Sequence, residues 1–221
     1  MDIVTHGMMG SIVAIPFFAT YPEASAAFMF GSVAPELDAF SRVLGRRAFL
    51  RAHQTYSHAF PVIALIAVVA WGAREAAGVW APWAPLAFAL GMAFHSTLDW
   101  TNTYGITLFA PFSKRRFCTE WVFFVDSVVL AACAAALAAI GLSISRGDGP
   151  GTIPSAVFAG SMFVYWLIKV GLRRRAWRAC PEGTLSLLPS ALFPWRFYGC
   201  SRQGEEIVIF GGGMTQCGKA L

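Results

Sequence analysis

Long apolar runs separated by short polar segments dominate the sequence. Four of them, at residues 59–73, 79–101, 121–144 and 153–172, approach or exceed the length of about 20 residues that crosses a bilayer. The first of these runs is short, so we expect its helix to take in residues at either end. The pattern predicts an integral membrane protein with four transmembrane helices.

The apolar stretch nearest the N-terminus, residues 7–34, follows a different pattern. Pro16 and the segment Tyr21-Pro22-Glu23 interrupt it. Proline interrupts helices, and a glutamate is costly in the middle of a bilayer. We therefore expect two short helices, at about 3–18 and 24–34, that form a half-buried or re-entrant hairpin.

The segment that follows the last apolar run is less apolar. Residues 195–200 and 206–210 flank a polar stretch at 201–205, which is typical of a β-hairpin. The predicted fold is thus an all-α membrane-embedded bundle over residues 1–178. A small tail over residues 179–221 carries the β-hairpin.

The composition supports a membrane location. Of the 221 residues, 57% are hydrophobic and 13% are charged, and the mean hydropathy is +0.58. A soluble domain carries roughly 25% charged residues. That shortfall excludes an ordinary soluble enzyme.

Basic residues cluster in alternate loops. The loops between the clusters hold only Arg74 and Arg146, each with an acid nearby. By the positive-inside rule, this alternation places the C-terminus in the cytoplasm. The loops also account for the net charge of +5, so no nucleic-acid partner is needed. The clustered residues are Arg42, Arg46, Arg47, Arg51, Lys114, Arg115, Arg116, Arg173, Arg174, Arg175 and Arg178.

Histidines and acids gather at the membrane face that this topology turns towards the cytoplasm. His95 and Asp99 are four residues apart, so on a helix they share one face. An ionisable residue in an apolar span is costly and marks a functional site. Other segments deliver further residues to the same depth: His6, Glu36, Asp38, His53, His58 and Asp126. This convergence predicts one polar site.

The residue types favour a metal site. Neutral imidazole and carboxylate are ligands for Zn²⁺, Mn²⁺ and Fe²⁺, of which we favour zinc. The donors exceed what one zinc ion needs, so either more than one ion binds or some residues orient the others. The five cysteines show no CxxC spacing. We predict these metal ligands: His6, Asp38, His53, His58, His95 and Asp99. Glu36 and Asp126 are the predicted catalytic base or ligand-orienting acids.

Each residue also has a structural interpretation. Asp2 could cap the first helix. Asp126 could pair with Lys114 or Arg115, and Glu36 could be a solvated loop acid. These alternatives leave the convergence of the segments as the main argument for a site.

Five ordered blocks of residues resemble the YdjM family of bacterial inner-membrane proteins. The resemblance covers about residues 1–130 and is looser beyond. The blocks are Met1-Asp2 with Thr5-His6-Gly7, Gly31 to Asp38, His53 to His58, His95 to Gly105, and Pro111-Phe112-Ser113 with Asp126. Glu36 stands where the family often has aspartate, and Gln54-Thr55-Tyr56 departs from its usual string. The order of histidines and acids is also similar, more remotely, to that of bacterial zinc-dependent phospholipase C enzymes.

The resemblance implies a membrane-bound, metal-dependent hydrolase. Its substrate would be a phosphoester or a lipid-like ester at the cytoplasmic face, attacked by a metal-activated water. The implied partners are the lipid bilayer and an anionic lipid or phosphoester, and the sequence does not set an oligomeric state. Two alternatives remain open: a metal or proton transporter, and a non-catalytic scaffold that a metal stabilises.

Overall fold

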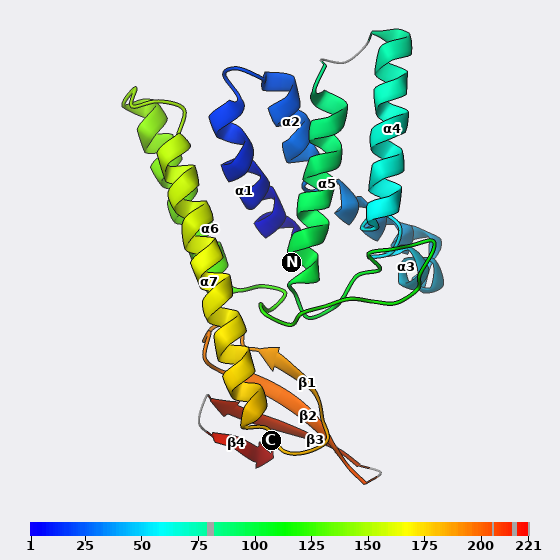
Figure 1. Cartoon of the computed structure of the whole chain (residues 1–221), viewed down its shortest axis with the longest axis vertical. Coiled ribbons are helices and arrows are strands. Elements are labelled where there is room, and N and C mark those ends of the chain that lie inside the picture. The colour runs from blue at the N-terminus through cyan, green and yellow to red at the C-terminus, as the bar shows by residue number, and fades with distance from the viewer. Residues whose placement is uncertain (79–81, 205, 214–215, 221) are drawn as a thin grey trace.

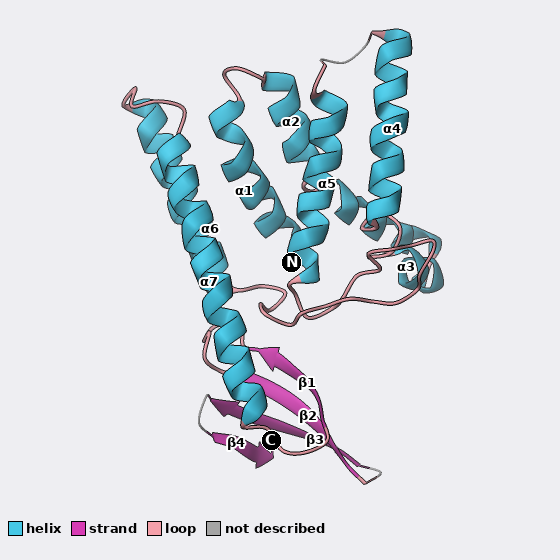
Figure 2. Cartoon of the chain, in the orientation of Figure 1, coloured by secondary structure: helices cyan, strands magenta, loops and turns pink. Residues whose placement is uncertain are grey.

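The computed structural model describes residues 1–78, 82–204, 206–213 and 216–220. A helical part is followed by a small C-terminal sheet (Figure 1, Figure 2). The α-helices are α1 (Ile3–Ala14), α2 (Pro22–Gly31), α3 (Arg46–Ala52), α4 (Phe60–Ala77), α5 (Ala84–Trp100), α6 (Ser127–Ser145) and α7 (Thr152–Arg178). Two 3₁₀ helices, η1 (Ile15–Phe17) and η2 (Ala34–Leu44), lie between them.

Three helices among the described residues are long and apolar enough to cross a membrane. They are α4, α6 and α7, and most of their residues are not buried inside the protein. As expected, α4 extends beyond the short run at 59–73, to Ala77.

The fourth predicted span is not confirmed. Residues 79–81 of the run at 79–101 lie outside the described residues, and the rest of the run folds as α5, which has only 17 residues and is about 26 Å long. That is shorter than a hydrocarbon core of about 30 Å. Pro82 and Pro85 explain the difference, because proline belongs in the first turn of a helix and so delays its start.

The predicted pair of short N-terminal helices is confirmed. The first, α1 with η1, ends before Tyr21, and α2 begins at Pro22, in the proline-rich interruption. Asp2 caps α1, since its side chain accepts hydrogen bonds from the backbone N–H groups of Val4 and Thr5. Whether this hairpin enters the bilayer stays a prediction.

Two glycines let α2 and α5 approach closely. A Cβ atom on Gly31 would lie 2.2 Å from the Phe88 carbonyl oxygen, and one on Gly91 would lie 2.3 Å from that of Phe28. Any side chain there would force the backbones apart. Because His95 lies one turn after Gly91, this contact brings His95 towards the C-terminal end of α2.

The C-terminal tail forms a larger sheet than expected. Four antiparallel strands follow in the order β1 (Thr184–Pro189), β2 (Phe197–Gln203), β3 (Glu206–Gly213) and β4 (Gln216–Ala220). The predicted hairpin is β2–β3, but the pairing of Gln203 with Glu206 makes its turn shorter than 201–205. The prediction of a helical bundle with a small C-terminal β element is thus confirmed in outline, and the hairpin is corrected to a four-stranded sheet.

The sheet is anchored to the end of α7. Leu187, Phe197 and Phe210 from three strands bury themselves with Ala176 of α7. Figure 1 shows the sheet gathered around that end of the helix. The boundary between 178 and 179 stays a prediction, and these contacts show that the two parts pack together.

One end of the helical part collects the basic residues. The starts of α4 and α6 and the ends of α5 and α7 lie at this end, which we call the polar end (Figure 1). Arg46 and Arg47 lie in α3, and Lys114 to Arg116 lie in the loop between α5 and α6. The basic clusters therefore share one end of the molecule, as the charge alternation predicts.

Replacing Gly91 by alanine is expected to lower the unfolding temperature. The methyl group would overlap the Phe28 carbonyl oxygen, so α2 and α5 must separate, at a cost of roughly 1–3 kcal/mol. Thermal unfolding in detergent, followed by circular dichroism, measures this loss. Gly72→Ala in α4 is the matched control, because a Cβ there meets nothing within 4 Å. Equal unfolding temperatures for both variants would contradict the close approach.

Candidate metal centre

Four side chains meet at the polar end of the helical part. They are His6 from α1, Glu36 from η2, and His95 and Asp99 from α5, and each offers a ligand atom within 4.8 Å of all the others. His58, just before α4, joins them through its Nε2 atom, which lies 3.1 Å from Nε2 of His95. We call these five residues the His–acid cluster.

The carboxylate of Asp99 is the centre of the cluster. Its Oδ1 atom lies 3.1 Å from Nε2 of His6, and its Oδ2 atom lies 3.3 Å from Nε2 of His58 and 3.5 Å from Nε2 of His95. These four side chains are completely buried, whereas Glu36 is 14% exposed and lies 3.8 Å from His95. Three ring nitrogens therefore converge on one buried carboxylate.

The geometry fits a bound divalent cation. Tetrahedral zinc has ligand bonds of about 2.0–2.1 Å, which puts its ligand atoms about 3.3–3.4 Å apart. The contacts between neighbouring ligand atoms, 3.1 to 3.8 Å, bracket that value, and the ligand atoms of His6, Glu36, His95 and Asp99 all lie within 4.8 Å of one another. The Asp99 Oδ2 atom is buried and has no hydrogen-bond partner. An unpaired buried carboxylate oxygen is costly, and a cation would satisfy it.

Hydrogen bonds orient two of the histidines. Nδ1 of His95 lies 2.8 Å from the carbonyl oxygen of Ser32, which can only accept, so Nδ1 carries the proton and leaves the lone pair on Nε2. Nδ1 of His58 lies 3.0 Å from the Ser57 hydroxyl. Burial lowers the pKa of His58, which keeps its ring neutral at pH 7, the form that binds metals.

Asp38 and His53 form a pair beside the cluster. Both oxygens of Asp38 already accept hydrogen bonds, from His53 at 2.6 Å and from Gln54 N–H and Ser57 O–H at 2.9 and 2.6 Å. Its Oδ2 atom also lies 3.5 Å from Nδ1 of His58. The structure thus puts Asp38 and His53, two of the predicted ligands, outside the His–acid cluster: Asp38 contacts and orients His58, and His53 contacts Asp38.

The charges of this pair follow from its contacts. Burial acts to raise the pKa of Asp38, but the hydrogen bonds from His53 and Ser57 outweigh it and hold that pKa below its usual value. The hydrogen bond to Asp38 raises the pKa of His53. In Glu36, burial raises the carboxyl pKa. Glu36 therefore holds a proton more readily than an ordinary glutamate.

Asp126 belongs to a different site, in contrast to its predicted catalytic role. It caps α6 by accepting a hydrogen bond from the Val128 N–H at 3.1 Å. The Tyr165 hydroxyl donates to it at 3.0 Å, and the Lys169 ammonium lies 3.8 Å away. Its carboxylate thus contacts side chains of α7 and not the His–acid cluster. The alternative partners, Lys114 and Arg115, are not its partners either.

Sequence reasoning missed three groups of the site. Asn102 donates a hydrogen bond from Nδ2 to Asp99 Oδ1 at 3.0 Å, and its place three residues after Asp99 was a usable signal. The amino group of Met1 contacts Asp99, and Met1 is fully buried. The Ser32 carbonyl is a backbone group, which no residue-type argument could select.

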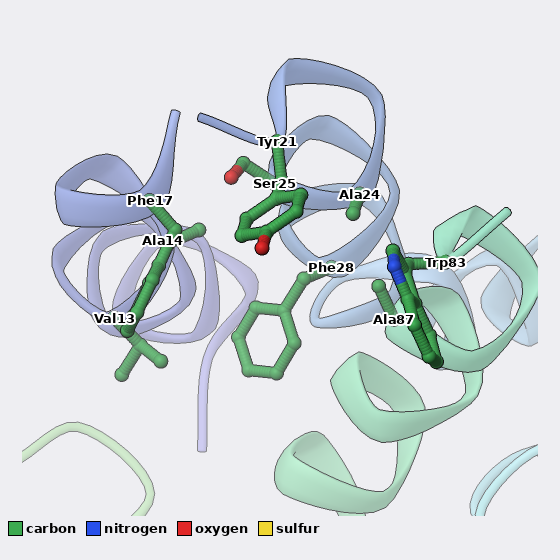
Figure 3. Close-up of a pocket in the computed structure, with 9 residues that line it drawn as sticks. All are labelled: Val13, Ala14, Phe17, Tyr21, Ala24, Ser25, Phe28, Trp83 and Ala87. Carbon is green, nitrogen blue, oxygen red and sulfur yellow. The ribbon is translucent and has the colours of Figure 1, made fainter. Parts of the chain in front are cut away.

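An apolar pocket of about 370 Å³ lies at the opposite end of the short helices. Phe17, Tyr21, Phe28 and Trp83 line it with smaller residues of α1, α2 and α5 (Figure 3). Its lining includes no histidine or carboxylate. This pocket is therefore not the metal centre.

The comparisons with known proteins identify the family. The family model described as YdjM inner membrane protein matches residues 1–176, which carry all five residues of the His–acid cluster. No curated protein matched the chain, and no solved structure matched it. The similarity to zinc-dependent phospholipase C enzymes stays a prediction. The chain belongs to the YdjM family of inner membrane proteins.

Proposed function

We propose that the protein is a membrane-bound, metal-dependent hydrolase that acts on a phosphoester or lipid-like ester. One observation carries the proposal: three imidazole nitrogens converge on the buried carboxylate of Asp99, whose Oδ2 atom has no hydrogen-bond partner. The Met1 ammonium contacts only the Oδ1 side of this carboxylate, so a cation among the three rings would satisfy the buried Oδ2 atom.

His6, His58, His95 and Asp99 would hold the ion, with zinc favoured by the imidazole-rich set. When bound, a divalent ion acts as a Lewis acid and activates water near neutral pH. The buried rings fix the donor atoms before any ion arrives. Asp38 and the Ser32 carbonyl hold the rings of His58 and His95 in place.

Glu36 is suited to move a proton. It is the one member of the His–acid cluster with an exposed side chain, 14% exposed, and its pKa is raised by burial. A carboxyl group with a raised pKa accepts and releases a proton closer to neutral pH. We assign it the role of general base towards water and of acid towards the leaving group.

The orientation of the site is part of the proposal. The basic clusters lie at the polar end, together with the His–acid cluster, whereas Arg74 and Arg146 lie at the other ends of α4 and α6. The positive-inside rule turns the polar end and the C-terminal sheet towards the cytoplasm.

A structural metal site is the second candidate. Four of the five cluster residues are completely buried, and a structural metal site is closed to solvent. In this case the ion would hold α1, α5 and the start of α4 together without catalysis.

Metal analysis tests the ligand set. Purified protein should contain at least one divalent ion per chain, and His95→Ala combined with Asp99→Ala should remove it, because both are central donors. Inductively coupled plasma mass spectrometry measures the content. Asp126→Asn is the matched control, since it changes a buried acid outside the cluster and should keep the metal. A wild-type content near zero would end the metal proposal.

Asp38→Asn should weaken metal binding without abolishing it. The amide lacks the charge that orients His58 and its neighbours, and losing such a partner typically costs about 10–100-fold in metal affinity. Competition with a fluorescent zinc chelator measures the affinity. Unchanged affinity in a folded variant would remove Asp38 from the site.

Glu36→Gln separates the hydrolase from the structural metal site. In a hydrolase, the variant should keep its metal and lose about 10²–10⁴-fold in rate, the usual contribution of a general base. Hydrolysis of bis(p-nitrophenyl) phosphate and of phosphatidylglycerol in detergent micelles gives the readout. Wild-type protein that holds its metal but cleaves neither substrate would favour the structural candidate.

A further inference from the structure

A second pocket lies at the polar end, between α3 and the loop that joins α5 to α6. Its volume is about 380 Å³, and both aromatic and charged residues line it. The lining residues used below are Phe49, His53, Gln54, Tyr104, Arg116 and Phe124. We call it the Arg116 pocket.

Two bridges of polar contacts join this pocket to the His–acid cluster. Asp38 contacts His53 of the pocket at 2.6 Å and His58 of the cluster at 3.5 Å. Asn102 accepts from the Tyr104 N–H at 2.8 Å and donates to Asp99 at 3.0 Å. The pocket therefore adjoins the candidate metal centre.

Arg116 is held in place without a charged partner. Its guanidinium donates to the Gly105 carbonyl at 3.0 Å, to Gln54 Oε1 at 3.4 Å and to the His53 carbonyl at 3.4 Å. No carboxylate pairs with Arg116 within the part of the chain that the structure describes. Neutral oxygen atoms thus fix the orientation of the Arg116 guanidinium, and no described carboxylate neutralises its positive charge.

Gln54 contributes to this arrangement in a strained conformation. Its φ is +58°, a left-handed value that is uncommon for residues other than glycine. Its backbone N–H donates to Asp38 at 2.9 Å, and its carbonyl accepts from the Thr107 N–H at 3.2 Å. Such strain persists where neighbouring contacts hold it, and it gathers at functional sites. Here it lets one residue contact both Asp38 and Arg116.

Rigid aromatic walls complete the pocket. Tyr104 and Phe124 pack edge to face, with ring centroids 5.5 Å apart, and Phe49 stacks on His53 at 4.6 Å. The pocket therefore offers one fixed cation among apolar surfaces, which suits an anionic group attached to an apolar or esterified body.

We propose that the Arg116 pocket binds the phosphate group of the substrate. A guanidinium pairs with phosphate through two parallel hydrogen bonds, and this pairing also fixes the orientation of the ligand. In naming a phosphoester as the substrate class, the inference rests on the proposed hydrolase function. The phosphate could belong to a membrane lipid or to a soluble phosphoester.

The surface beside the pocket favours the lipid source. Phe40 and Val43 of η2 are 71% and 85% exposed; Arg42 lies between them along the chain, and Arg46 and Arg47 follow at the start of α3. Exposed apolar residues mixed with arginines suit the boundary between lipid headgroups and acyl chains. The pocket would then open at the depth of the lipid phosphates.

Binding of two phosphate probes to the full-length protein in detergent tests the proposal. Phosphatidylglycerol retention, compared with that of diacylglycerol, which lacks phosphate, is measured by native mass spectrometry. Glycerol phosphate binding is measured by calorimetry. Arg116→Ala should weaken binding of the effective probe about tenfold, because a charge-assisted hydrogen-bonded pair is lost.

Arg115→Ala is the matched control. It removes the same charge from the neighbouring position, where the side chain lies over Phe117 outside the pocket, and should change binding less than about twofold. Should Arg116→Ala fail to fold, Arg116→Lys keeps the charge, loses the planar fork, and should still bind several-fold more weakly.

Each outcome decides a point. Arg116-dependent binding of phosphatidylglycerol supports the lipid source, and equal binding of glycerol phosphate supports the soluble source. Equal losses in both alanine variants, or no loss in Arg116→Ala, would overturn the proposal. Binding to chelator-treated wild type is measured alongside. If the protein never holds metal but still binds the probe through Arg116, the hydrolase proposal is refuted and the phosphate-binding pocket is supported.

Discussion

The arrangement of the helical part depends on the contacts that surround the buried carboxylate of Asp99. Removing an ionised carboxylate from water costs several kcal/mol unless other groups compensate it. The compensating groups come from α1, from the segment before α4 and from α5 itself, through His6, His58 and His95. These segments must therefore meet at one point. Asn102 then ties the loop after α5 to the same carboxylate.

Close helix packing makes this meeting possible. Gly31 and Gly91 allow the backbones of α2 and α5 to touch, and this contact places the Ser32 carbonyl against His95. A backbone carbonyl is a fixed acceptor, so it sets the tautomer of the ring as well as its position. The glycines thus act on the site although they carry no functional group.

The polar end combines three kinds of group in one region. Donors for a cation lie in the His–acid cluster, an uncompensated arginine lies in the adjoining pocket, and exposed apolar residues lie on η2. Asp38 links the first two by touching both His53 and His58. A second polar cluster, around Asp126 and Lys169, instead joins α6 to α7. Packing, not residue type, separates these two clusters.

The sequence by itself determined the apolar segments, the interruption near Pro22, the residue types of the site and the grouping of basic residues at one end. Periodicity and charge are local properties, so they can be read along the chain. Only the tertiary structure decided which acids meet which histidines. Asp38 and Asp126 are both predicted to belong to one site, yet one orients His58 and the other faces α7. It also set the length of α5 and added two strands to the predicted hairpin. Such pairings depend on contacts between distant segments, which no local pattern encodes.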